Sequence, residues 1–464
     1  MKKIFLFALA TACVATASAE GYQVNTLSAK QFGMAHTGVS QKLNSESVWF
    51  NPAAAAYQEQ KFTVAAGFTG IKALADWESA DRSESYSSDN GLSTPLYLNL
   101  NYKVNDDLAV GLSFNTPFGS SVNWGDSWQG AHLVQDISLS SYCAQPTVSY
   151  KLFNDKLSIG AGLTVSWGTF ELSRSIFPVS ATTNATLAYA ASAGYTAAGM
   201  DDMAAAVSSA ITSVGDAPLA SVTLNGQAAV AVGVNVGLMY DFNEKWSVGF
   251  AYRSKTMMKV AEGDAEVDYA NEVVQAAIYS TTQIMDEGTF EAELPLPANM
   301  NWGVTFRPTE RWNISAEMQW IGWSAYDNLD VLFTEESLAD YSINAEKSYK
   351  NTFAYRLGAE FAAKEWLDVR AGIYTDQSPV SSDHLNPETP SMDKIGYTFG
   401  FSVMPFECNR NLSLDVAYGY ISPASKERYG SYTDTNKLTG AAEAFAGYYR
   451  AVAHTFSVGV SWGF

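Results

Sequence analysis

The chain has 464 residues, of which 47% are hydrophobic, 13% aromatic and 16% charged, with a formal net charge of −20 at pH 7. This acidity argues against a nucleic-acid partner, because phosphate binding requires clustered lysine and arginine. The composition also fits a soluble β-sandwich, so it does not assign the fold class by itself. The aromatic content favours a transmembrane β-barrel, which carries girdles of aromatic side chains at both membrane interfaces.

Residues 1–19 have the features of a secretory signal peptide. Lys2 and Lys3 precede an apolar run, and Ala17-Ser18-Ala19 fits the small-residue pattern of a cleavage site. We therefore expect a mature chain that begins near Glu20. No other segment approaches the roughly 20 continuous apolar residues of a membrane helix. A membrane form of this chain must then be a β-barrel, since only helices and closed barrels satisfy their backbone hydrogen bonds in lipid.

The cysteines do not indicate a disulfide framework. Cys13 leaves a lipoprotein signal as an alternative, but Ala10 stands where such a signal carries leucine. Cys143 falls in a predicted strand and Cys408 in a predicted turn, so we expect no disulfide between them. The spacing of cysteine and histidine gives no metal-binding motif, and we expect neither a metal nor another cofactor.

Residues 20–60 lack the alternation of a membrane strand. Glycine, proline and polar residues interrupt the segment, as in Asn51-Pro52-Ala53. It also carries aromatic residues, including Phe32 and Trp49, that a periplasmic extension would expose. Of the two possible locations, periplasm or lumen, we therefore predict the lumen, where the segment forms a plug, or hatch. A plugged barrel is not a general diffusion pore.

From residue 61 to 464, segments with alternating apolar and polar residues recur, and short polar turns join them at one end only. Six such turns close hairpins of twelve strands, and a first strand near 61–72 and a last near 446–464 bring the count to fourteen. An even count places both termini in the periplasm. We thus predict an all-β transmembrane barrel of about fourteen antiparallel strands. The turns are Asn105-Asp106-Asp107, Phe153-Asn154-Asp155, Asn243-Glu244-Lys245, Pro308-Thr309-Glu310, Ala363-Lys364-Glu365 and Asn409-Arg410-Asn411.

The segment Asn115-Thr116-Pro117-Phe118-Gly119 breaks the alternation of the strand that begins at Leu108. Proline cannot donate to the ladder, so it bends a strand or ends it. One interpretation is the end of the strand before an outer loop. The other is an inward kink that opens a gap in the barrel wall.

Two predicted outer loops are long, at about 176–224 and 262–288. The first is rich in alanine, and Asp201-Asp202-Met203 precedes an alanine run, so we expect one or two helices there. Loops of this length in a compact protein are functional or disordered. The helical propensity favours a functional role.

The parity of the strands places charged residues in the lumen. In the strand 226–242 the even positions are large and apolar, while the odd positions, such as Gly233 and Asn235, face inward. A charge that faces the middle of the bilayer costs about 2–4 kcal/mol, so charges should take the inward parity. The charged residues with inward parity are Arg253, Arg307, Glu317, Arg356, Glu360, Asp368, Arg370 and Asp415. They form an ion-pair network that braces the wall, or they contact a ligand.

The last strand alternates Phe456, Val458, Val460, Trp462 and Phe464 with small residues, as expected of the strand that ends an outer-membrane barrel. We expect the barrel-assembly machinery to recognise this strand through Phe464. The other expected partners are outer-membrane lipids and a hydrophobic small molecule, with the protein a monomer in a diderm (Gram-negative) bacterium.

The motifs follow, in order and spacing, those of the FadL-type family of outer-membrane transporters of hydrophobic compounds, and the chain resembles this family over its whole mature length. The motifs are Gly21-Tyr22-Gln23-Val24-Asn25, Asn51-Pro52-Ala53, Asn115-Thr116-Pro117-Phe118-Gly119 with Trp124, Trp128 and Gly130, Tyr252-Arg253-Ser254, Leu294-Pro295-Leu296-Pro297, Trp323-Ser324, and Arg370-Ala371-Gly372 with Asp376, Ser378, Pro379 and Val380.

The resemblance implies a fourteen-stranded barrel with an N-terminal hatch, helical outer loops that first capture an apolar ligand, and lateral release into the membrane at a kinked third strand. We expect the ligand to be a long-chain fatty acid, with aromatic hydrocarbons or other lipids as alternatives. Two other functions remain open, a surface adhesin or phage receptor and an ungated polar porin. The porin would conduct ions steadily, whereas a plugged channel would not.

A fatty-acid site needs an apolar groove and one cation. Burial of a methylene is worth about 0.8 kcal/mol, so a sixteen-carbon tail supplies on the order of 10 kcal/mol, and the cation orients the carboxylate. Arg174 is the best candidate, because it has inward parity and lies in a segment that resembles the arginine-bearing segment of the family. Arg253 and Arg370 are the reserves. The alternative for Arg174 is an ion pair with Glu171 or another acid of the wall.

Catalysis has little support in the sequence, and we expect the protein not to be an enzyme. The chain has four histidines, His36, His132, His384 and His454, and no nucleophile elbow or Ser-x-x-Lys motif. A barrel lipase would need a serine and a histidine on adjacent lipid-facing strands. His454 has lipid-facing parity, but an interfacial histidine explains it.

Overall fold

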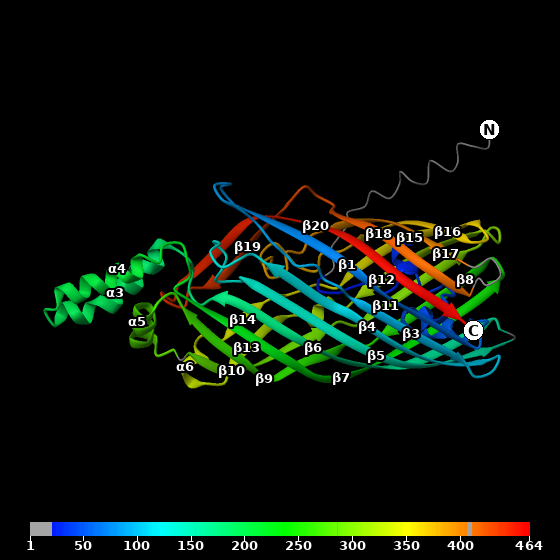
Figure 1. The fold of residues 1–464 in the computed structure, drawn as a ribbon, viewed down its shortest axis with the longest axis horizontal. Coiled ribbons are helices and arrows are strands. Elements are labelled where there is room, and N and C mark those ends of the chain that lie inside the picture. Colours follow the sequence, from blue (N-terminus) through cyan, green and yellow to red (C-terminus); the bar gives the residue numbers. More distant parts are fainter. Residues whose placement is uncertain (1–20, 154, 285, 406–410) are drawn as a thin grey trace.

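A computed structural model describes residues 21–464 except 154, 285 and 406–410, and these residues form an elongated β-barrel (Figure 1). The predicted signal peptide, the alternative lipoprotein signal at Cys13, and Cys408 with most of its predicted turn lie outside the described residues. Cys143 is a buried free thiol. Within the described part of the chain, no helix is both long and apolar enough to span a membrane.

The described strands belong to one closed antiparallel sheet, which contains fourteen strands around its circumference. The first strand pairs with the last, from Thr63 opposite Gly463 to Ser79 opposite Gly447, and this closes the barrel. The predicted fourteen strands are therefore confirmed. They are β1 (Phe62–Ser79), β3 (Leu96–Lys103), β4 (Leu108–Asn123), β5 (Asp136–Leu152), β6 (Leu157–Ser175), β7 (Ala220–Asn243), β8 (Trp246–Arg253), β11 (Asn299–Phe306), β12 (Trp312–Ile321), β15 (Thr352–Lys364), β16 (Leu367–Asp376), β17 (Lys394–Val403), β18 (Leu412–Pro423) and β20 (Ala442–Gly463).

Six further strand segments continue six of these strands beyond an interruption, toward the end of the barrel that carries the loop helices (Figure 1). Strand β7, for example, pairs with β8 near one end and with β9 near the other. The barrel thus extends as a paired sheet above its shortest strands. The segments are β2 (Ser85–Ser87), β9 (Thr256–Tyr269), β10 (Glu287–Leu296), β13 (Asn328–Phe333), β14 (Ile343–Glu346) and β19 (Arg428–Thr435).

The predicted faces of the strands agree with the exposure of their side chains. In β7 the even positions Val232 and Val234 are exposed toward the outside, while Gly233 and Asn235 are buried. Four of the charged residues predicted to face inward, Glu317, Arg356, Arg370 and Asp415, are also buried. The apolar surface outside and the mixed-charge lumen follow from the same period of two.

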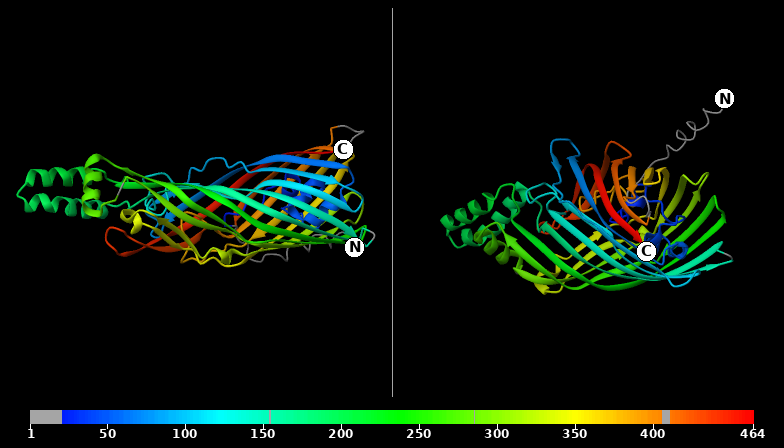
Figure 2. Two further views of the ribbon diagram at one scale, coloured as in Figure 1. Left: turned by 90° about the horizontal axis from the view of Figure 1, so that it is seen from below. Right: turned by 45° about the vertical axis from the view of Figure 1, so that its right-hand side comes forward.

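The loop between β6 and β7 forms two helices, as the sequence indicates. They are α3 (Ala181–Ala197) and α4 (Asp201–Thr212), which make a hairpin that projects from the barrel, and α5 (Glu272–Thr282) lies beside them (Figure 2). The side chain of Ser180 caps α3 by accepting a hydrogen bond from the backbone N–H of Thr183, at 3.1 Å. A short helix, α6 (Glu336–Ala339), follows β13. The second long loop is shorter than predicted, because β9 continues to Tyr269.

Residues 21–60 lie in the lumen, at the end of the barrel where the chain terminates (Figures 1 and 2). Most of their side chains are buried, including Phe32 and Asn51. Here the name hatch denotes these residues. Their elements are α1 (Ala29–Phe32), η1 (Asn44–Glu46), α2 (Ser47–Phe50) and η2 (Pro52–Tyr57).

Glycines on the lumen side of the wall allow the hatch backbone to approach the strands closely. A Cβ atom at Gly249 would lie 2.0 Å from the carbonyl oxygen of Val39, and one at Gly358 would lie 2.3 Å from that of Met34. Only glycine avoids these overlaps. The wall is therefore shaped to the hatch on several strands.

Candidate functional site

The wall of the barrel is interrupted beside strand β4. Pairing of β4 with β3 stops at Asn115 opposite Tyr97, whereas pairing with β5 shifts in register between Asn115 and Phe118 and then continues to Asn123. Pro117 lies in this shift and has no N–H to donate. The second half of β4 thus has a strand neighbour on one side only.

The missing neighbour of β4 is the stretch 88–95, which connects β2 to β3 and is not a strand. The resulting gap has hydrogen bonds at both ends. At one end, the backbone N–H of Leu96 donates to Thr116 Oγ1 at 3.0 Å. At the other, the N–H of Asn123 donates to Asn90 Oδ1 at 2.8 Å. Between these bonds, no β-ladder joins β4 to the stretch 88–95 among the described residues.

The start of the hatch covers this gap from the lumen. Gln23 forms an isolated antiparallel bridge with Phe118. The N–H of Val24 donates to the carbonyl of Pro117 at 2.8 Å, and the N–H of Gly119 donates to that of Tyr22 at 2.9 Å. Residues 22–24 therefore supply backbone partners that β4 lacks in the wall.

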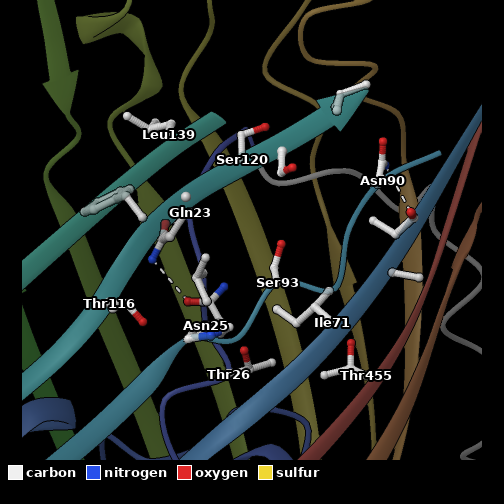
Figure 3. Close-up of a pocket in the computed structure, with 18 of the residues that line it drawn as sticks. Gln23, Asn25, Thr26, Ile71, Asn90, Ser93, Thr116, Ser120, Leu139 and Thr455 are labelled. Carbon is white, nitrogen blue, oxygen red and sulfur yellow. Dashed lines mark hydrogen bonds between the residues drawn. The ribbon is translucent and has the colours of Figure 1, made fainter. Parts of the chain in front are cut away.

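A cavity of about 570 Å³ lies directly behind the gap, and we call it the inner cavity (Figure 3). One rim of this cavity comes from the 88–95 stretch and the other from β4 and β5. Both rims carry apolar and hydroxyl side chains. Its apolar lining includes Val24, Ile71, Leu74, Leu92, Leu96, Phe118, Val122, Leu139, Tyr142, Tyr374 and Ile421. Its polar lining includes Gln23, Asn25, Thr26, His36, Asn90, Ser93, Thr116, Ser120, Ser138, Ser140, Thr389, Ser391, Lys394 and Thr455.

A second cavity, of about 180 Å³, lies toward the loop helices, and we call it the outer cavity. Arg174 lines it and forms an ion pair with Asp434 on β19, with 3.3 Å between the nitrogen and the oxygen. Glu171, the partner considered from the sequence, lies on the exposed face of β6 instead. The apolar lining includes Leu133, Ile176, Val222, Val267, Phe333, Leu338, Tyr341, Ile343, Ala345 and Tyr432. The polar and charged lining includes Ser342, Asn344, Glu388, Asp434, Thr435 and Lys437.

The loop 377–393, between β16 and β17, separates the two cavities. Glu388 lines the outer cavity, while Thr389 and Ser391 line the inner one. Glu388 forms an ion pair with Lys347, and both side chains are almost completely buried. This pair fixes the loop in the lumen, because separating two buried charges is strongly unfavourable.

His132 lies beside Arg174 in the segment 124–135, outside the membrane-spanning strands. Burial and, to a smaller extent, the positive charge of Arg174 lower the pKa of His132 to about 4. Its Nδ1 atom is buried and has no hydrogen-bond partner among the described residues. The neutral imidazole is therefore the form that fits this packing.

We expect acidification to loosen the segment 124–135. Because the pKa of His132 is about 4 in the folded state and 6.5 ordinarily, the unfolded segment binds the proton more readily. The stability from neutral His132 is complete above about pH 6.5 and is lost as the pH falls toward 4. Hydrogen exchange of this segment, corrected for intrinsic rates, should be faster at pH 5 than at pH 7, and His132→Gln should remove the difference. The same pH dependence in both proteins would contradict this.

The other predicted site residues make contacts within the hatch and the wall. Arg253 donates to the carbonyl of Trp49 at 2.9 Å, and its guanidinium lies 3.8 Å from the centroid of a ring of Trp49. It lines a third cavity of about 40 Å³, whereas Arg370 pairs with Glu360 at 2.6 Å. Neither arginine lines the inner or the outer cavity. Arg174 is the predicted arginine that reaches a ligand-sized space.

The predicted hatch motif Asn51-Pro52-Ala53 joins the hatch to strand β7. Asn51 Nδ2 donates to the carbonyls of Val39 at 2.6 Å and Leu238 at 3.0 Å, and Asn51 Oδ1 accepts from the N–H of Ala53. The side chain thus satisfies backbone groups of both the hatch and the wall. Within the described residues, no group of three or more His, Cys, Asp or Glu is placed to hold a metal ion.

Sequence reasoning did not identify Asp434, the Lys347–Glu388 pair or Lys394. Lys394 was detectable, because Tyr397 and Phe399 mark the outward parity of its strand and place it inward. The partners of Arg174 and Lys347 were not detectable, because they come from distant strands and loops.

Comparison with known proteins places these features in a family. A family model described as "Outer membrane protein transport protein (OMPP1/FadL/TodX)" matches residues 10–464. Outer membrane protein P1 of Haemophilus influenzae is 24% identical over 330 residues, which cover 68% of this chain and 63% of that relative. The long-chain fatty acid transport protein of Escherichia coli K12 is 22% identical over 424 residues, which cover 89% of this chain and 90% of that protein.

Solved structures show the same fold. A FadL homologue from Pseudomonas aeruginosa superposes with a TM-score of 0.77 at 18% identity, covering 96% of this chain and all of that chain. The toluene transporter TodX of P. putida gives a TM-score of 0.67 at 15% identity, covering 97% of this chain and 99% of that chain. The superpositions support the architecture of the barrel. At identities this low they do not identify the ligand.

Proposed function

Because this chain belongs to the OMPP1/FadL/TodX family of outer membrane transport proteins, we propose that the hydrophobic compound it carries is a long-chain fatty acid. The protein is an outer-membrane channel of a Gram-negative bacterium and not an enzyme. Its relatives include a long-chain fatty acid transport protein, and the proteins that share its fold include a toluene transporter. The choice between these ligand classes rests on the chemistry of the cavities.

The observation that carries this choice is the presence of cations beside apolar side chains in the outer cavity. Arg174 lines this cavity together with Lys437, Asp434 and Glu388, and its ion pair with Asp434 keeps it oriented into the lumen. A tail of sixteen carbons gains on the order of 10 kcal/mol from burial, at about 0.8 kcal/mol per methylene. A carboxylate beside Arg174 would then fix the direction in which the ligand lies.

The proposed route begins at the loop helices and ends in the membrane. The ligand binds first in the outer cavity, passes the loop 377–393 into the inner cavity, and leaves through the gap beside β4. Residues 22–24 must move for this last step, because they cover the gap. The predicted kink at Asn115-Thr116-Pro117-Phe118-Gly119 thus acts as the lateral opening.

Substitution of Arg174 tests the ligand class. We expect Arg174→Met to weaken binding of palmitate by about tenfold or more, because a hydrogen bond to a charged group contributes about 1.5–3 kcal/mol. Binding of hexadecane, which has no headgroup, should not change. Displacement of a fluorescent fatty acid from the purified barrel measures both affinities.

A matched control for this experiment is Arg82→Met. Arg82 is exposed, pairs with Glu78 and Glu427, and lines neither cavity. The Arg82→Met variant should bind palmitate and hexadecane as the wild type does. Equal loss of palmitate and hexadecane in Arg174→Met would rule out a carboxylate role for Arg174.

Two alternatives have specific support. Uptake of an aromatic hydrocarbon is favoured by the aromatic lining of the inner cavity, where Phe118, Tyr142 and Tyr374 lie, and toluene in the same displacement assay tests it. A surface-recognition role is favoured by the projecting α3–α4 hairpin. Deletion of the hairpin, residues 181–212, would then abolish adhesion or phage binding and leave uptake intact.

The remaining partners concern the membrane. We propose that the protein works as a monomer in contact with outer-membrane lipids. Phe464 is exposed, and its carbonyl accepts a hydrogen bond from the N–H of Phe62 at 2.8 Å where the barrel closes. This exposed terminal side chain suits recognition by the barrel-assembly machinery before closure.

A further inference from the structure

The third cavity, of about 40 Å³, lies between the hatch and the wall, and we call it the hatch cavity. Its charged lining residues, among those that the structure describes, are Arg253, Glu317 and Arg356, which all belong to wall strands. The hatch contributes Gln31 and Trp49 to the lining. Two arginines and one glutamate leave this cavity with an excess of one positive charge.

Glu317 does not compensate the charge of Arg253. Its Oε1 atom pairs with Arg356 at 3.4 Å, and its Oε2 atom accepts hydrogen bonds from the N–H groups of Gly38 and Val39 in the hatch. Within the part of the chain that the structure describes, Arg253 forms no ion pair. A charge held between the hatch and the wall without a counter-charge is unfavourable.

The contacts of Arg253 hold its guanidinium in place and leave donors available. The group stacks on Trp49, and its Nη2 atom donates to the carbonyl of Trp49 at 2.9 Å and to Gln145 Oε1 at 3.0 Å. The Nε and Nη1 atoms have no hydrogen-bond partner among the described residues. The stacking and the two hydrogen bonds orient the cation, but none of these partners is an anion.

The size of the hatch cavity favours a small anion. A water molecule needs about 10–15 Å³ of cavity volume, so about 40 Å³ holds one small ion and no acyl chain. We propose that this cavity binds a monovalent inorganic anion, chloride under physiological conditions, between Arg253 and Arg356. The anion accepts charge-assisted hydrogen bonds from the wall and contacts the hatch at Gln31 and Trp49. This inference goes beyond the proposed function and does not depend on the transported ligand.

The anion site lies directly behind the segment that covers the gap. Gln23, Val24 and Phe118 line both the hatch cavity and the inner cavity, so they separate the two. Displacement of residues 22–24 would therefore open the anion site. Because chloride binds the closed form in preference to the open one, it should stabilise the closed position of the hatch.

Bromide tests the site directly, since it replaces chloride in halide sites and scatters anomalously. Crystals of the mature barrel grown in sodium bromide should show an anomalous difference peak within hydrogen-bonding distance of Arg253. Density that fits water alone at this position, with no anomalous peak, would overturn the inference.

Hydrogen exchange in solution measures the effect of the anion on the hatch. The comparison is between sodium chloride and sodium gluconate at equal ionic strength, because the gluconate anion is too large for the hatch cavity. Exchange of peptides that contain Gln31 and Trp49 should be slower in chloride, by about tenfold at about ten times its dissociation constant. Equal exchange rates in the two salts would overturn the inference.

Substitution of Arg253 locates the effect. Arg253→Met should remove the difference between the two salts, and Arg253→Gln, which retains a hydrogen-bond donor without the charge, should do the same. The matched control is Arg311→Met, because Arg311 also stacks on an aromatic ring, that of Phe361, but lines none of the three cavities. Arg311→Met should keep the salt difference. A difference that persists in both Arg253 variants would place the anion elsewhere and overturn the inference, while the proposed function would stand.

Discussion

A disulfide between cysteines at positions 23 and 118 should stop fatty-acid uptake without unfolding the barrel. Gln23 and Phe118 form the bridge that covers the gap, and the two backbone hydrogen bonds flank this pair. They therefore form a non-hydrogen-bonded pair, with about 4.5 Å between Cα atoms. A disulfide spans about 4.4–6.8 Å between Cα atoms, so a pair of this type can accommodate it.

Uptake of radiolabelled palmitate by whole cells measures this effect. The double variant Gln23→Cys/Phe118→Cys, with Cys143 and Cys408 replaced by serine, should be inactive when oxidised and recover after reduction. A disulfide between Val64 and Leu100, which already face each other in β1 and β3, is the matched control and should leave uptake unchanged. Full uptake by the oxidised 23–118 variant would show that residues 22–24 do not gate the route.

Replacement of Gly249 by valine should displace the hatch and convert the closed barrel into an ion-conducting one. The added Cβ would lie 2.0 Å from the carbonyl oxygen of Val39, which is backbone and cannot rotate away. Glu317 holds this turn by accepting hydrogen bonds from the N–H groups of Gly38 at 2.8 Å and Val39 at 3.0 Å. Overpacking of this kind costs about 1–3 kcal/mol or more, so the turn at Val39 must move away from the wall.

Planar-bilayer recording distinguishes the two states. The wild type should show almost no steady conductance, and Gly249→Val should show a persistent current. Gly70→Val is the control, because a Cβ atom at Gly70 meets its nearest neighbour, on Leu92, at 3.6 Å, an ordinary contact. A Gly249→Val barrel as tight as the wild type would mean that the hatch does not close the lumen.

The architecture was predictable because alternation is a local property. Large apolar residues at even positions of 226–242 and small ones at odd positions determine which side faces lipid, and the short turns give the number of strands. Pro117 likewise marked the break in β4, since its missing N–H acts at its own position.

The details of the site depend on contacts between segments far apart in the chain, and periodicity carries no information on these. The ion pair of Arg174 with Asp434 joins residues on β6 and β19. The stretch 88–95 forms the second rim of the gap, and it does so only because β4 lies opposite. The sequence 88–95 contains Asn90-Gly91 and Pro95, residue types that are typical of a break in a strand, but the break was not among the predictions. The fold of loop 377–393 into the lumen had no comparable signal.

Native mass spectrometry of the protein, extracted from its own outer membrane, tests the proposed ligand most directly. We predict bound free fatty acid in the wild type and its loss in Arg174→Met, because the carboxylate contact in the outer cavity would be absent. Empty protein, or bulk phospholipid alone in both, would contradict fatty-acid transport and favour a neutral hydrocarbon or a surface-recognition role.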